Sequence, residues 1–178
     1  MGPERSALKR AFFAGFVATA ILTLMMYVAP VVGLPNIDIA AALGTPFARG
    51  LHGAWWRGVL VGEPFGGPAS PFTAAWFGGL AVFLFFGSVV SPYIFVYAFP
   101  GLLGSSWMRG VQWGVFVWVF GGVAVMVAMG LGFDETHFSH PFAPFFASLG
   151  AHVIYGAILG ALAGKVLVIG HKTHPQLA

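Results

Sequence analysis

Residues 11–34 read AFFAGFVATAILTLMMYVAPVVGL, an apolar stretch without a single charged side chain. A helix needs about 20 apolar residues to cross the ~30 Å hydrocarbon core of a bilayer, so this stretch is long enough to span a membrane. Apolar runs of similar length recur at 72–99, 107–133 and 143–169. A soluble helical bundle would need charged residues on the outer face of each helix, and these runs carry almost none. The pattern therefore predicts a polytopic membrane protein.

The four runs predict an all-α fold in which residues 1–178 form a single transmembrane domain. We expect an antiparallel four-helix bundle, an integral membrane fold with spans at about 11–33, 72–97, 107–131 and 145–169. A proline inside the second of these spans should kink that helix.

The connection at 35–71 is the only large segment outside the predicted spans. Its part at 46–61 mixes aromatic with basic residues, Trp55 and Arg57 among them, a composition that suits the headgroup level of a membrane. We expect this part to form an external helical segment that lies in the membrane interface.

Lys and Arg residues are divided unequally between the two sides of the predicted bundle. One side holds Arg5, Lys9, Arg10, Arg109, Lys165 and Lys172. The other side holds only Arg49 and Arg57. Because cytoplasmic segments carry the excess of Lys and Arg, both termini are expected in the cytoplasm and the connection outside. The expected location is the bacterial inner membrane, which the chain crosses several times.

The composition narrows the classes of function. Charged residues make up 7% of the chain and apolar residues 58%, so the expected surroundings are the lipid bilayer. The net charge of +3 comes from basic residues at helix ends, which anchor spans, and therefore gives no reason to expect a nucleic-acid partner. The chain has no cysteine, which excludes disulfides, thiolate metal sites, c-type haem attachment and iron–sulfur clusters held by this chain.

A stripe of mostly small residues runs along the last predicted span. It recurs at every fourth position, at Ser148, His152, Gly156, Gly160 and Gly164. Small residues at this spacing let helix backbones approach closely, which is how helices associate in lipid. The third and first spans offer similar small faces, at Gly110, Gly114 and Gly15. We interpret these residues as helix-packing positions within the bundle, with the helix of another protein as the alternative.

His152 is the only ionisable side chain well inside a predicted span. Such a residue suggests a proton relay, a ligand contact or a haem ligand, but a neutral histidine that hydrogen-bonds across a helix interface is the simpler interpretation. A haem held by two histidines would need a second one at similar depth, and the other spans have none. No cofactor is therefore expected.

The loop before the last span gathers carboxylates and imidazoles at Asp134, Glu135, His137 and His140. These are suitable ligands for zinc or copper, although such spacing arises in any hydrophilic loop and a solvated polar loop is the favoured interpretation. The sequence contains no phosphate-binding, metalloprotease or nucleophile-elbow motif and no pair of intramembrane carboxylates. We therefore expect a protein that is not an enzyme.

Short motifs near the two ends of the chain carry a resemblance to a known family. The first is Ala14-Gly15-Phe16-Val17-Ala18-Thr19, followed by Gly33-Leu34-Pro35 and Asp38-Ile39-Ala40-Ala41. The second is HVIYGAILG at 152–160, in the last predicted span. With them the chain resembles the small four-span bacterial membrane proteins grouped as a domain of unknown function, the DUF6789-type family. The resemblance implies fold and topology rather than a mechanism. The chain departs from the family pattern in its longer connection at 45–71 and in Trp76, where the family is expected to have a histidine.

These features favour a non-catalytic accessory or structural subunit that packs against a larger inner-membrane complex. A respiratory or other electron-transfer complex is the favoured assembly, so other membrane-protein subunits are the expected partners. Two alternatives stay open: a small-solute or proton pathway centred on His152, and a haem-binding or metal-binding membrane protein.

Overall fold

The computed structural model describes residues 5–33, 39–40, 43–44, 72–122 and 142–173. Every regular element in this part of the chain is helical. The elements in order are α1 (Arg5–Val28), η1 (Ala29–Val32), α4 (Ala74–Phe85), η2 (Phe86–Val90), α5 (Ser91–Ala98), η3 (Phe99–Gly101), α6 (Ser106–Val117), η4 (Trp118–Gly122) and α8 (Phe142–Thr173). The segments η1 and η3 are 3-10 turns, and η2 and η4 are π-helical.

Three helical stretches are long and apolar enough to cross a membrane, at Arg5–Val32, Ala74–Gly101 and Phe146–Gly164. They coincide with three of the four predicted spans, which confirms the all-helical, membrane-type character of the described residues. The remaining predicted span, 107–131, begins as α6 and η4 and leaves the described residues after Gly122. The interfacial segment predicted at 46–61 lies outside them altogether.

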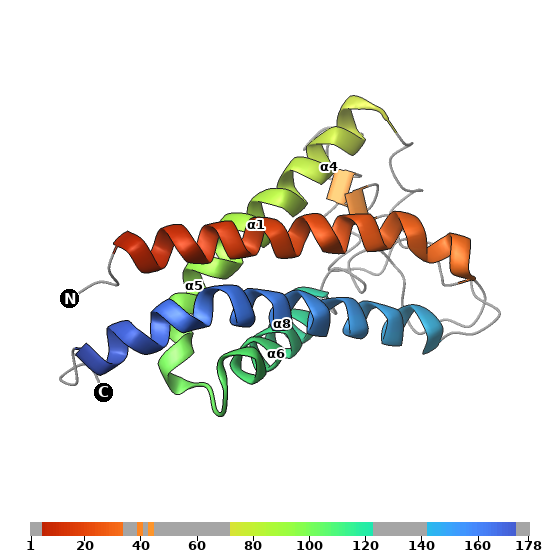
Figure 1. Ribbon diagram of the computed structural model, residues 1–178. Helices are drawn as coiled ribbons and strands as arrows, with labels where there is room; N and C mark the ends of the chain where they lie inside the picture. Colours follow the sequence, from red (N-terminus) through yellow and green to blue (C-terminus); the bar gives the residue numbers. More distant parts are fainter. Residues whose placement is uncertain (1–4, 34–38, 41–42, 45–71, 123–141, 174–178) are drawn as a thin grey trace, which may run out of the picture. The chain divides into compact units, whose positions relative to one another are not determined.

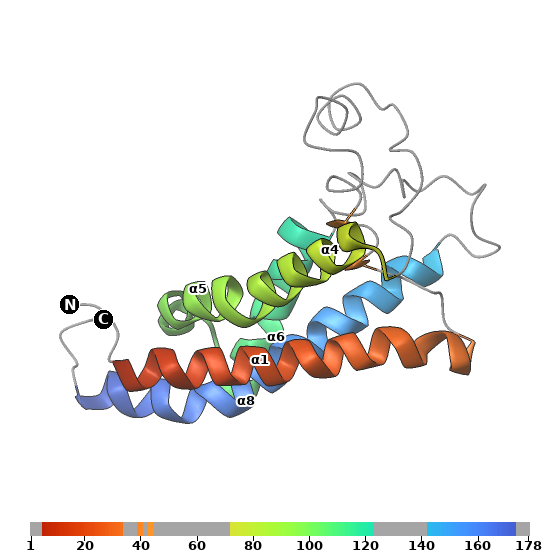
Figure 2. The same cartoon turned by 90° about the horizontal axis from the view of Figure 1, so that it is seen from above.

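The chain divides into two compact units. The first consists of Met1–Met25, Leu84–Trp118 and Leu149–Ala178, and the second of Met26–Phe83 and Val119–Ser148. The described part of the first unit thus contains most of α1, all of α5 and α6, and the greater part of α8. Within this unit α1 and the C-terminal half of α8 run side by side in both views (Figures 1 and 2).

The core of the first unit combines small residues on one helix with large ones on the next. The inward face of α1 is almost free of side-chain bulk, since Ala11, Ala14 and Ala18 are fully buried. On α5 and η3 the rings of Phe95 and Phe99 are buried and meet edge to face, with their centroids 5.4 Å apart. Alanine faces of this kind allow close helix approach in lipid, where van der Waals packing replaces the hydrophobic driving force.

The turn between α5 and α6 is held by two side chains of α6. Gln112 bonds both backbone groups of Leu103, accepting from its N–H at 3.1 Å and donating to its carbonyl at 2.7 Å. Arg109 donates to the carbonyls of Gly104 and Phe99 and stacks over the Phe99 ring at 4.7 Å. Gly104 has a φ of 89°, which lets the backbone reverse at no steric cost. These contacts fix the turn.

The second unit has its own small core around Trp76 of α4. Trp76 and Ala40 are buried together, with Ala75 and Leu80 packed beside them. Gly79 approaches so closely that a Cβ there would collide with the carbonyl of Ala40. Trp76, the residue that departs from the family pattern, is therefore a packing residue in this structure.

Candidate functional site

The small-residue stripe of α8 lies directly against α6. A Cβ added at Gly156 would meet the Gly110 carbonyl, and one at Gly110 would lie 2.8 Å from the Gly160 Cα. Gly114 faces the backbone carbonyl of His152 in the same way. At the C-terminal end of the stripe Gly164 faces Ser106, and a Cβ added at Gly164 would lie 2.7 Å from the Ser106 hydroxyl oxygen. The two backbones are thus in contact along the stripe, and a side chain at any of these glycines would separate them.

Gly15 belongs to a different contact. It faces Pro92 of α5, whose ring would clash with a Cβ at this position. One turn further along α1, the Thr19 side chain occupies the space beside Gly87 of η2. The Thr19 hydroxyl donates back to the Gly15 carbonyl at 2.7 Å, so this buried polar group is satisfied within its own helix. The sequence grouped Gly15 with the other small residues, but the structure gives it a separate partner.

The π-helical segment η2 ends at Val90, two residues before Pro92, and the proline accounts for it. Proline has no N–H to donate, and its ring crowds the carbonyl of the residue four positions earlier. The backbone therefore widens into a π turn, in which the Ser91 N–H reaches back to the Phe86 carbonyl. At this spacing the next carbonyl, that of Gly87, would have bonded residue 92. Gly87 is therefore left without its backbone donor.

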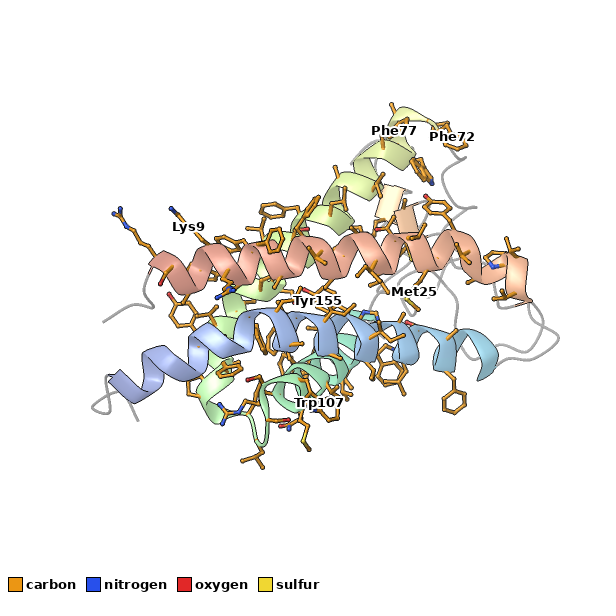
Figure 3. All side chains as sticks on the ribbon, viewed as in Figure 1. Lys9, Met25, Phe72, Phe77, Trp107 and Tyr155 are labelled. Carbon is orange, nitrogen blue, oxygen red and sulfur yellow. The ribbon has the colours of Figure 1, made fainter. Side chains whose placement is uncertain are left out.

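Tyr155 of α8, which is labelled in Figure 3, supplies the missing donor. Its hydroxyl donates to the Gly87 carbonyl at 2.7 Å. A backbone group freed by proline in a membrane helix has to be satisfied by a neighbouring helix, a side chain or an ordered water. Tyr155 is buried and performs this function from a helix more than sixty residues away in the sequence.

Ser91 and Trp113 extend this bond into a chain. The hydroxyls of Tyr155 and Ser91 lie 2.9 Å apart, and the Trp113 indole N–H donates to the Ser91 oxygen at 3.0 Å. Because the single Tyr155 proton goes to an acceptor-only carbonyl, the Ser91 proton lies between the two hydroxyls. The donors then run in one direction, from Trp113 through Ser91 and Tyr155 to Gly87. We name these four residues the Tyr155 chain; it links α5, α6, α8 and η2.

Sequence reasoning missed the Tyr155 chain, although one signal for it was present. A proline inside an apolar span releases a carbonyl four or five residues earlier, and such a carbonyl requires a donor from another helix. Hydroxyl and indole groups are the donors that apolar spans still contain. Tyr155 and Ser91 were therefore identifiable as candidates, but their pairing depends on helix rotation, which the sequence does not specify.

His152 lies one turn from Tyr155 on α8. Its side chain is half-buried, and its backbone forms part of the contact with Gly114. Ser148, the first residue of the predicted stripe, is also half-buried but belongs to the second compact unit.

The acidic histidine loop lies outside the described residues. The predicted weak metal ligands of this loop are therefore not described. They are Asp134, Glu135, His137 and His140. Over the residues that the structure does describe, no group of three or more His, Asp or Glu side chains gathers in a way that would hold a metal ion.

Comparison with known proteins gives one match. The family model described as "Family of unknown function (DUF6789)" matches residues 6–173, nearly the whole chain. No curated protein and no solved structure matches the chain.

Proposed function

The chain belongs to the DUF6789 family of unknown function, and we propose that it is a non-catalytic accessory subunit that binds a larger membrane complex through its outer helix faces. The observation that carries this proposal is the division between small and large residues. The close backbone contacts inside the first unit are lined by glycine and alanine, and many large apolar side chains face outward, although Phe95, Phe99 and Leu159 are buried in the core.

The outer face of α1 shows this division most clearly. Phe13, Phe16 and Leu24 are 63%, 58% and 64% exposed. Together with the exposed Ala20 they recur at spacings of three and four residues, the pattern of a seam between two packed helices. A seam of this kind suits either lipid or one partner helix, and two phenylalanine rings in the same seam provide large contact areas for a partner.

The interior polar groups support a structural function for the same unit. Tyr155, Ser91, Trp113 and Thr19 bond to one another or to backbone carbonyls, and these bonds hold the helices together. Because these interior polar groups are used in packing, we propose that contacts with other proteins are made by the outer helix faces.

The proposal also includes the number and orientation of the spans, beyond the three that the described residues contain. We propose four antiparallel spans in the bacterial inner membrane, with both termini in the cytoplasm. The connection 35–71 would lie outside, with 46–61 along the membrane interface. The unequal distribution of Lys and Arg supports this orientation. Respiratory and other electron-transfer complexes are the assemblies that we would test first.

Purification in mild detergent tests the proposal. The tagged full chain should retain a membrane enzyme in a fixed ratio, seen as a common band on a native gel. Deleting the chain should reduce the assembly of that enzyme while leaving its cofactors chemically intact.

A surface variant makes the test specific. The triple change Phe13→Ala, Phe16→Ala and Leu24→Ala should release the partner without unfolding the chain, because all three side chains are exposed. The matched control is Ile154→Ala with Leu162→Ala, which removes exposed apolar side chains from α8 instead. Reconstituted protein that moves protons or a solute by itself, with the activity lost in His152→Ala, would overturn the proposal in favour of a transport pathway.

A further inference from the structure

Three cations lie close together at the start of α1. Arg5, Lys9 and Arg10 are all exposed, and Lys9 extends away from the helices in Figure 3. Within the described residues none of the three takes part in an ion pair or a hydrogen bond. The nearest acidic residue in the sequence is Glu4, which the structure does not describe. This end of the helix therefore presents positive charge without a described counter-charge.

The helix itself makes this charge less favourable. The N-terminus of a helix carries the positive end of the backbone dipole, where anions are stabilising and cations are not. The first turn of α1 contains Arg5 and no acidic residue. The side-chain cations and the positive end of the dipole therefore lie together at this end of the helix. An anion from outside the described chain would be stabilised by the cations and by the dipole.

The depth of these cations can be estimated from one contact. Gly15 of α1 faces Pro92 of α5, and the two helices run in opposite directions in both views (Figures 1 and 2). Arg10 and Tyr97 each lie five residues from this contact, toward the same end, a rise of about 7.5 Å along either helix. Tyr97 is exposed, and tyrosine is enriched at the level of lipid headgroups. Tyr97 is therefore expected near the headgroups, and the cations of α1 at the same level.

Aromatic side chains continue below the cations on the same helix. Phe13 lies one turn below Lys9, and Phe16 follows one turn below Phe13, both exposed. Cations at headgroup level above exposed rings at acyl-chain level complement a lipid with a negative headgroup. A soluble phosphate would match the cations but would have no contact with the rings.

We propose that the start of α1 binds an anionic phospholipid, with Arg5, Lys9 and Arg10 at the headgroup and Phe13 and Phe16 along an acyl chain. Phe13 and Phe16 also belong to the seam proposed for a partner helix, so this lipid would bind the chain where that partner is absent, and its test is made on the chain without a partner. Each basic residue near an anionic membrane surface increases binding about fivefold, and added salt weakens this increase.

Native mass spectrometry of the full chain in mild detergent tests the proposal. The protein is given equal amounts of phosphatidylglycerol and phosphatidylcholine, and the retained lipids are counted. Preferential retention of phosphatidylglycerol is expected. Equal retention of the two lipids would overturn the proposal. A thermal unfolding assay distinguishes the lipid from its headgroup: inorganic phosphate that raises the melting temperature as much as phosphatidylglycerol does would also overturn it.

The decisive variant is Lys9→Gln with Arg10→Gln, which should lower retention of phosphatidylglycerol by tenfold or more. Both side chains are exposed, so the fold should persist, and orientation in a membrane does not matter in detergent. The conservative variant Lys9→Arg should bind as the unchanged chain does. The comparison variant Arg49→Gln with Arg57→Gln removes the same charge from the connection 35–71, and its loss of retention should be clearly smaller than that of the α1 variant. Equal losses in both double variants would show a general charge effect and contradict a site at α1.

Discussion

Pro92 and Tyr155 show how one residue type creates a requirement that another fulfils. The proline leaves the Gly87 carbonyl without its backbone donor, and the tyrosine hydroxyl replaces that donor from α8. In water a freed carbonyl could bond to solvent, but the hydrocarbon core of a membrane offers none. The Tyr155 hydroxyl takes part in two hydrogen bonds, and its bond to the Gly87 carbonyl is the one that solvent cannot replace there.

We expect Tyr155→Phe to lower the free energy of unfolding by about 0.5–2 kcal/mol, because it removes the donor and leaves the Gly87 carbonyl unsatisfied. Unfolding by denaturing detergent, followed by circular dichroism, measures the change. The control is Tyr97→Phe, which removes an exposed hydroxyl whose partner is the exposed Tyr93 hydroxyl at 3.2 Å. This control should cost much less.

A double-mutant cycle identifies the reason for the Tyr155 effect. Pro92→Ala restores a backbone N–H at position 92, and this N–H can again bond within the helix. In the Pro92→Ala background, Tyr155→Phe should therefore cost clearly less than in the unchanged chain. Equal costs in the two backgrounds would show that Tyr155 contributes by packing alone, and not by satisfying the carbonyl that the proline releases.

At the scale of elements, the contact between α6 and α8 depends on the absence of side chains. Gly156 lies against the Gly110 carbonyl, whereas Gly150 on the same helix has no atom within 4 Å of an added Cβ. The two glycines are alike in sequence and differ only in the helix face that they occupy. They form a matched pair for testing the packing stripe.

We expect Gly156→Ala to destabilise the first unit by about 1–3 kcal/mol, because the new methyl group overpacks a backbone contact. Gly150→Ala should be neutral or slightly stabilising, because alanine is the better helix former and the position is open. Thermal unfolding in detergent compares the two variants with the unchanged chain. Equal tolerance of both substitutions would contradict the contact between these helices.

The sequence predicts the helices of this protein better than their ends and their irregularities. Helix α1 begins at Arg5, before the predicted start at residue 11, because Arg and Lys are good helix formers and the helix continues beyond the apolar core. Helix α8 extends to Thr173 for the same reason, past the predicted end at residue 169. Hydropathy marks where a segment enters lipid, and this boundary is not the end of the helix.

The sequence pattern could not predict the π-helical segments or the hydrogen bonds of the Tyr155 chain. Spans that are apolar on every face carry almost no periodic signal, so the direction in which Tyr155 or Ser91 points cannot be predicted. The small-residue stripe on α8 was visible because glycine spacing is itself a periodic signal. The helix that packs against this stripe could not be predicted, because several helices offered similar small faces.

At the scale of the whole molecule, the distribution of charge decides how the chain lies in the membrane. Two described groups of cations, Arg5 to Arg10 on α1 and Arg109 on α6, belong to the first compact unit. Arg109 is bonded to the carbonyls of its own turn, so it fixes the turn as well as contributing charge. The cations of α1 remain exposed and contribute to the excess of positive charge from which the orientation is predicted.

We expect reporter fusions to show cytoplasmic activity at Ala178 and external activity after Gly66. The excess of Lys and Arg on one side makes translocation of that side unfavourable, and this side includes both ends of the chain. Four spans return the chain to the side on which it began, whereas three would leave the ends on opposite sides. An external reporter at Ala178, with a cytoplasmic one before α1, would therefore show that the segment 107–131 does not cross the membrane. A cytoplasmic reporter at both positions would instead mean that an even number of spans lies between Gly66 and Ala178, so that one of the predicted spans 72–97, 107–131 and 145–169 does not cross the membrane.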